Sequence, residues 1–184
     1  VIPYLYSLSD TAKRIGAVNT IVNKDGRLYG YNTDYYGMKA LVQKTGIEIK
    51  GKKVLILGTG GTSKTANVLT EDMGAAEIIT VSRTKTEKYI TYEEAVKEHS
   101  DAEVIINTTP SGMFPDCENE PIDISAFDNL EGVLDAIYTH KNNAQTKDRI
   151  ISVISERFNL RFWGNGSADR IFASVDFVSF IYKI

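Results

Sequence analysis

Three glycines stand close together directly after a short apolar run. The run Val54–Leu57 predicts a strand that is buried on both faces. It leads into Gly58-Thr-Gly-Gly-Thr-Ser63, and the residues that follow place apolar side chains at helical spacing. A glycine turn between a strand and a helix can bind the pyrophosphate of a dinucleotide through backbone N–H groups, although such a turn can also be a plain connection. We predict phosphate contacts at Gly58, Thr59, Gly60, Gly61 and Thr62.

The end of the next predicted strand, Glu77–Val81, indicates which dinucleotide binds. A carboxylate there would accept hydrogen bonds from the ribose of NAD, but the chain continues with Ser82-Arg83-Thr84. The guanidinium fork of Arg83 suits a 2′-phosphate, and Ser82 and Thr84 add hydroxyl donors. An ordinary solvated arginine is the alternative. We therefore predict NADP as the cofactor, held on this side by Ser82, Arg83 and Thr84.

Strands and helices alternate along most of the chain. This order predicts an α/β fold with a doubly wound (Rossmann-like) parallel sheet. Further elements are expected as strands at Glu103–Asn107 and Gly132–Ala136, and as helices at Tyr35–Lys44 and Thr91–Glu98. Before them, Ala17–Asn23 and Arg27–Tyr31 flank Asp25-Gly26, which predicts a hairpin, and Asp10–Ile15 is expected to be the end of a helix.

Composition excludes several classes of partner. The 184 residues are 42% hydrophobic and 24% charged, and the net charge of -3 argues against nucleic acid or an anionic membrane as a partner. The single cysteine, Cys117, cannot form an internal disulfide, which suits a reducing, cytoplasmic location. We expect no metal site and a small-molecule substrate. The first residue is Val1, so we expect a piece of a longer protein.

Several motifs in a fixed order resemble the shikimate dehydrogenase family. They are Ile15-Gly-Ala-Val-Asn-Thr20, Gly30-Tyr-Asn-Thr-Asp34, the glycine turn, Ser82-Arg-Thr84 and Asn107-Thr-Thr-Pro-Ser-Gly-Met113. Leu134-Asp-Ala-Ile-Tyr138 is similar to the next strand of that family, so that the resemblance covers residues 1–138. It implies reversible, NADP-dependent interconversion of 3-dehydroshikimate and shikimate, with the substrate in a cleft between two domains.

The resemblance also implies roles for single residues. Asp34 is the expected catalytic carboxylate, which pairs with a lysine and also contacts the substrate. Asn19 and Tyr138 are expected to contact the substrate as well. Structural roles remain open: Asp34 as a helix N-cap, Asn19 as a hairpin residue and Tyr138 as packing. The residues expected along the cofactor, toward its nicotinamide, are Asn107, Thr108, Thr109 and Met113.

The family pattern divides the chain and also shows where it departs. We expect residues 1–34 to be the remnant of an α/β substrate-binding domain, 35–50 a linking helix, 51–138 the NADP-binding domain and 139–184 a poorly matched, helical segment. The family's lysine precedes the stretch that matches Val1-Ile-Pro-Tyr4, and Thr139-His140 replaces its Asn-Pro. Alternatives are therefore a catalytically incompetent NADP-binding fragment or a quinate-using relative. A methylene-tetrahydrofolate dehydrogenase fits the motifs less well.

Overall fold

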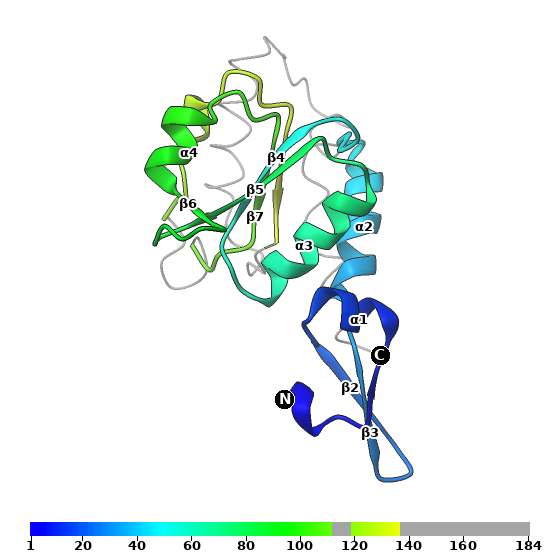
Figure 1. The fold of residues 1–184 in the computed structure, drawn as a ribbon. Coiled ribbons are helices and arrows are strands. Elements are labelled where there is room, and N and C mark those ends of the chain that lie inside the picture. Colours follow the sequence, from blue (N-terminus) through cyan, green and yellow to red (C-terminus); the bar gives the residue numbers. More distant parts are fainter. Residues whose placement is uncertain (112–118, 137–184) are drawn as a thin grey trace.

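Two β-sheets organise the chain in the computed structural model, which describes residues 1–111 and 119–136 (Figure 1). The large sheet has five parallel strands in the order β6-β5-β4-β7-β8. Its strands are β4 (Lys53–Leu57), β5 (Glu77–Ser82), β6 (Ile90–Thr91), β7 (Val104–Asn107) and β8 (Gly132–Asp135). The strand order runs outward in both directions from β4, which confirms the predicted doubly wound sheet.

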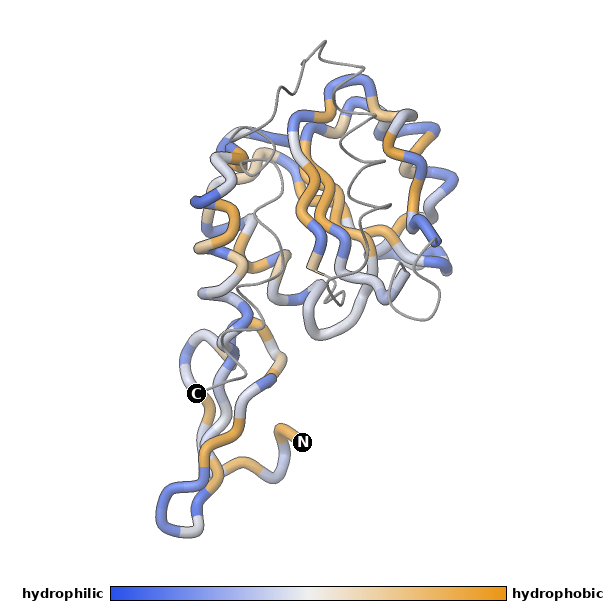
Figure 2. The backbone as a smooth tube through the Cα atoms, turned by 180° about the vertical axis from the view of Figure 1, so that it is seen from behind, coloured by the Kyte–Doolittle hydropathy of each residue, from blue (hydrophilic) through white to orange (hydrophobic). Residues whose placement is uncertain are grey.

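Helices cover both faces of the large sheet. On one face lie α2 (Asp34–Thr45) and α3 (Gly61–Asp72), and on the other lies α4 (Tyr92–Glu98), as Figure 1 shows. Side chains of β4 alternate between them: Val54 and Ile56 belong to the core under α2 and α3, whereas Leu57 packs in the core on the α4 side. Figure 2 shows the resulting apolar centre of this sheet. Because both faces are covered, the central strands β4 and β7 are continuous apolar runs at Val54–Leu57 and Val104–Ile106, as is typical of a buried parallel sheet.

The small sheet precedes this unit and has the order β1-β3-β2. Its strands are β1 (Ser7–Leu8), β2 (Thr20–Lys24) and β3 (Arg27–Tyr31), accompanied by the 3-10 turn η1 (Ile2–Tyr4) and the helix α1 (Asp10–Ile15). Asp25 and Gly26 both have positive φ, which confirms the predicted two-residue turn. Ile21 and Val22 point to opposite faces of β2 and are both exposed, so this strand is uncovered on both sides.

Several elements differ from the sequence-based expectation. The helix at Asp10 is complete rather than the end of a longer one, because the Ser9 hydroxyl caps it by accepting a hydrogen bond from Ala12 N–H. Strand β2 is Thr20–Lys24 instead of Ala17–Asn23, and the side chain of the preceding Asn19 bonds to Thr33. The two-residue strand β6 was not predicted; it is too short to show a hydrophobic period.

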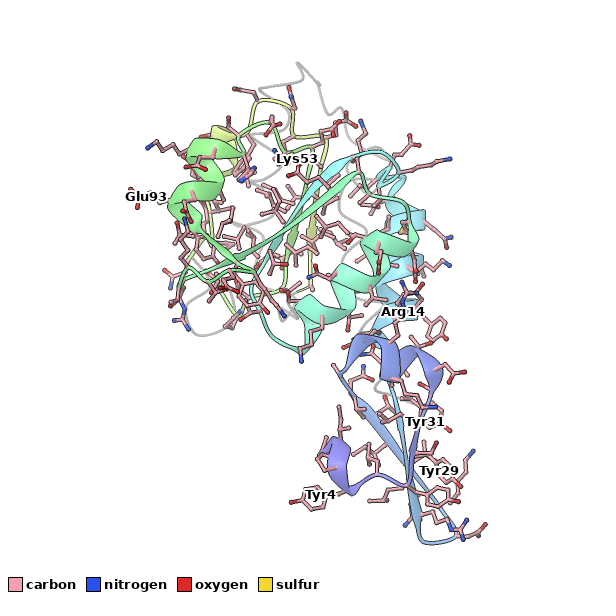
Figure 3. All side chains as sticks on the ribbon, in the orientation of Figure 1. Tyr4, Arg14, Tyr29, Tyr31, Lys53 and Glu93 are labelled. Carbon is pink, nitrogen blue, oxygen red and sulfur yellow. The ribbon has the colours of Figure 1, made fainter. Side chains whose placement is uncertain are left out.

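Polar contacts join the small sheet's segment to α2 and α3. Arg14 of α1 pairs with Glu71 at 2.9 Å and with Asp72 at 2.6 Å, both at the end of α3. Figure 3 shows Arg14 at this junction. The Tyr35 hydroxyl donates to the same Asp72 carboxylate at 2.6 Å. None of the helices in the described part of the chain has the length and apolarity that a bilayer span requires.

Candidate cofactor and substrate site

The glycine turn follows β4 at the centre of the large sheet. Neighbouring strands leave β4 in opposite directions, so the turn lies at the switch point where parallel sheets bind ligands. Gly58 has φ of 104°, and a Cβ there would lie 3.0 Å from Thr108 Oγ1, so only glycine fits. Gly60 is extended, and no atom lies within 4 Å of a Cβ placed on it. Packing within the protein therefore does not require glycine at position 60. The open space beside Gly60 would allow a ligand to approach the backbone closely.

The N-terminus of α3 presents free backbone donors. Gly60 is the N-cap residue, and no side chain caps this end of the helix. Thr59, Gly60 and Gly61 are exposed, whereas Ser63 is buried against the sheet. A helix of twelve residues has a positive dipole end here and unsatisfied N–H groups in its first turn. The arrangement can therefore hold a phosphate, as the sequence predicts.

The end of β5 carries the expected basic residue. The Ser82 hydroxyl accepts a hydrogen bond from Thr84 N–H at 3.2 Å and so shapes the turn. Lys85 is paired with Glu94, which belongs to the capping box of α4. Arg83 is exposed, and no carboxylate in residues 1–111 or 119–136 forms an ion pair with it. Arg83 can therefore bind an incoming anion without breaking an ion pair within this part of the chain.

The residues after β7 form the wall beside the glycine turn. Asn107 is buried, and its Oδ1 accepts hydrogen bonds from Thr109 N–H at 3.0 Å and Thr109 Oγ1 at 2.7 Å. Its Nδ2 donates to Asp135 at 3.2 Å. The Thr108 hydroxyl donates to the Leu57 carbonyl. Asn107 and Thr108 are thus engaged within the protein, and their support of a cofactor would be through the shape of this wall. Met113 lies outside the described residues.

Asn19 is part of a hydrogen-bonded cluster with Thr20 and Thr33. Asn19 Oδ1 accepts from Thr33 N–H at 2.9 Å, and Asn19 Nδ2 donates to Thr33 Oγ1 at 3.1 Å. The Thr20 hydroxyl donates to Asn19 Oδ1 at 3.1 Å. These contacts fix the Asn19 amide directly beside the first residue of α2, Asp34.

Asp34 is not the N-cap of its helix. Thr33 occupies that position, and the side chain that satisfies the helix end is Asn32, whose Oδ1 accepts from Tyr35 N–H at 3.2 Å. Burial raises the pKa of Asp34, and the Asn19 amide opposes the shift in part. Within the described residues no cation forms an ion pair with Asp34. A half-buried carboxylate without such a partner is typical of a functional site.

The structure brings the Asn19–Asp34 group next to the glycine turn. A Cβ on Gly61 would lie 3.7 Å from Ala17 Cβ, and Asn32 Nδ2 donates to Thr65 Oγ1 of α3 at 3.1 Å. Sequence reasoning named Asn32 only as part of the motif Gly30-Tyr-Asn-Thr-Asp34, and it did not single out Thr65, which lies two residues past the glycine motif. Tyr138 lies outside the described residues. In residues 1–111 and 119–136 no cluster of three His, Cys, Asp or Glu side chains could bind a metal.

Comparison with known proteins places this geometry in a family. No protein-family model matches the chain. The NADP(+)-dependent shikimate dehydrogenase of Clostridium beijerinckii is 40% identical over 147 residues, which are 75% of this chain and 54% of that protein. The chain thus spans about half the length of the curated relatives it matches.

Solved structures agree with the sequence relatives. Shikimate dehydrogenase 1 of Peptoclostridium difficile is 30% identical with a TM-score of 0.70, and the match covers 96% of this chain and 74% of that one. A shikimate dehydrogenase solved in complex with NADP+ is 29% identical with a TM-score of 0.61, covering 74% of this chain and 53% of its own. Since the sequence relatives and the solved structures agree, the chain belongs to the shikimate dehydrogenase family.

Proposed function

We propose that the chain holds NADP(H) at the carboxyl edge of the large sheet. The observation that carries this proposal is Arg83, an exposed cation without an ion-pair partner among the described residues, at the end of β5 beside an uncapped glycine turn. The turn would receive the pyrophosphate through the N–H groups of Gly61 and Thr62. Arg83, with the Ser82 and Thr84 hydroxyls, would receive the 2′-phosphate.

The reaction proposed for the whole protein is the reversible reduction of 3-dehydroshikimate to shikimate. Bound NADPH supplies the hydride for the ketone carbon. Asn19, whose amide is held between Thr33 and Asp34, would contact substrate hydroxyls. Asp34 would hold a general acid in place as the carboxylate, or transfer the proton itself, and its raised pKa suits the second role. Curated relatives named as NADP(+)-dependent shikimate dehydrogenases support this substrate class.

The cofactor proposal is tested by titrating the chain with NADPH and with NADH. We expect NADPH to bind more tightly, and Arg83→Ala to weaken NADPH by roughly 10- to 100-fold, the value of losing a charge-assisted hydrogen bond. NADH affinity should stay nearly unchanged. Lys97→Ala is the matched control, since Lys97 is an exposed cation on α4. Equal affinities for the two cofactors, unchanged by Arg83→Ala, would contradict the proposal.

A second candidate is that this chain binds the cofactor without turnover. The observation that favours it is the lack of an ion-pair partner for Asp34 among the described residues, because the family pairs this carboxylate with a lysine. The measurement is NADP+-dependent oxidation of shikimate, followed by absorbance of NADPH. Cofactor binding with no detectable rate would support this candidate, whereas measurable turnover by the 184-residue chain would exclude it.

A further inference from the structure

A buried amide lies where the small sheet meets α2 and α3. Asn32 is 3% exposed, and both the nitrogen and the oxygen of its amide form hydrogen bonds. Its Nδ2 donates to the Ala17 carbonyl at 3.3 Å and to Thr65 Oγ1 at 3.1 Å, while its Oδ1 accepts from Tyr35 N–H at 3.2 Å. One side chain therefore connects the loop before β2, the first turn of α2 and Thr65 of α3.

Thr65 carries this connection to the glycine turn. Its hydroxyl is fully buried, accepts from Asn32 and donates to the Gly61 carbonyl at 3.1 Å. Tyr35, Asn32, Thr65 and Gly61 thus form a continuous chain of hydrogen bonds from one helix to the other. Bonds in such a chain polarise and strengthen one another in a buried site.

Asn32 is also connected to Asn19 and Asp34, the residues proposed to contact the substrate, through its neighbours in sequence. Thr33, which follows Asn32, is bonded to the Asn19 amide, and Asp34 comes next. An aliphatic side chain could fill the volume of Asn32, but only an amide has directed bonds that set the relative placement of three segments. The directed hydrogen bonds of the Asn32 amide, more than the volume of its side chain, therefore fix the positions of these segments.

We propose that Asn32 is a positioning residue which, through Thr65, fixes the glycine turn relative to Asn19 and Asp34. Asn32 itself does not touch the cofactor or the reacting atoms. The part of this inference that concerns affinity rests on the proposed cofactor function, whereas the part that concerns coupling between α2 and α3 does not. Two measurements on the full chain separate these parts.

The first measurement is NADPH affinity in variants that change the connection with little change in volume. Thr65→Val and Asn32→Leu should each weaken NADPH by about fivefold, the net value of one hydrogen bond. Thr65→Ser keeps the hydroxyl and should keep the affinity. The double variant should be no weaker than either single one, because both remove the same connection. Thr70→Val is the matched control: Thr70 is equally buried on α3, and its hydroxyl bonds only to carbonyls of α3.

The second measurement is amide hydrogen exchange without cofactor. Thr65→Val lies on α3, yet it should speed exchange at Tyr35 N–H of α2 by about fivefold, because that amide is bonded to the side chain that Thr65 holds. Thr65→Ser and Thr70→Val should leave this amide unchanged. If Asn32→Leu does not fold, Thr65→Val still provides the test.

The outcomes distinguish the two proposals. Unchanged exchange at Tyr35 in Thr65→Val would overturn the positioning role, whether or not NADPH binds. Weaker NADPH binding in Thr65→Val but not in a folded Asn32→Leu would overturn it too, because the effect would then come from the Gly61 bond alone. Failure of the unmodified chain to bind NADPH, with the exchange result as expected, would reject the cofactor function and keep the coupling.

Discussion

At the scale of single residues, Asp34 is the carboxyl for which we propose a function and whose burial opposes stability. Its carboxyl is half-buried, and burial raises its pKa above the ordinary value of 3.8. A group whose pKa is raised on folding stabilises the protein at low pH, and this contribution is lost as the pH rises through the folded pKa. At neutral pH the ionised carboxylate therefore costs stability, as functional carboxylates often do.

Asp34→Asn should stabilise the chain at pH 7. The expected gain is about 0.5–2 kcal/mol, the usual range for relieving a functional site, and it should shrink as the pH falls toward 4. Thermal melts across this range provide the measurement. Asp101→Asn is a control of opposite sign, since Lys53 lowers the pKa of Asp101, so its substitution should destabilise most at neutral pH. A loss of stability in Asp34→Asn at pH 7 would refute this reading of the site.

The hydrogen bonds of single side chains could not be predicted from the sequence. The family motifs indicated Asn19 and Asp34, but not that Asn32 supplies the cap for α2. The motif Gly-Tyr-Asn-Thr-Asp contains three residues able to cap a helix, and only the hydrogen bonds distinguish them. The bonding of Asn107 to Thr109 and Asp135 likewise depends on neighbouring strands that sequence does not place in register.

At the scale of elements, two glycines of the glycine turn have different roles: packing requires Gly58, whereas we propose that ligand binding requires Gly60. Gly58→Ala should destabilise the chain by about 1–3 kcal/mol, because the position has positive φ and a Cβ would press on Thr108 and Thr109. Gly60→Ala should leave stability nearly unchanged, since the backbone is extended and the space is open. It should instead weaken NADPH, whose phosphates would meet the added methyl group. Denaturant unfolding and NADPH titration measure the two effects. Equal losses of stability in Gly58→Ala and Gly60→Ala would contradict the different roles of the two glycines.

Most elements of the large sheet follow from the sequence because their signals are local. Apolar runs of four or five residues ended by Gly or Asn located β4 and β7. The helix expected at Thr91–Glu98 is present as α4, and the structure adds that Thr91 and Glu94 form its capping box. The sequence predicted the small sheet less completely. β1 has only two residues and pairs with β3 in parallel, and this contact depends on neighbours distant in sequence.

At the scale of the whole molecule, the segment carrying the small sheet is joined to the rest by one buried and one exposed set of contacts. The exposed set is Arg14 with Glu71 and Asp72. Hydrogen bonds from Tyr35 and Arg14 lower the pKa of Asp72, so this contribution to stability is present above the ordinary pKa of Asp72 and is lost as the pH falls below it.

Arg14→Ala should therefore lower the melting temperature in dilute buffer at pH 7. The difference from the unmodified chain should shrink in about 0.5 M salt, where exposed ion pairs are screened, and also at acidic pH. Melting curves at two salt concentrations provide the measurement, with Lys97→Ala as a control that removes an exposed cation elsewhere. A difference that does not depend on salt would show that Arg14 acts by packing and not by charge.

A crystal structure of the chain grown with NADP+ would test the central claim most directly. We predict density at the carboxyl edge of the large sheet, with the pyrophosphate against the N–H groups of Gly61 and Thr62 and the 2′-phosphate beside Arg83. NADP+ bound at any other place on the chain, or no density at a saturating concentration, would contradict the account.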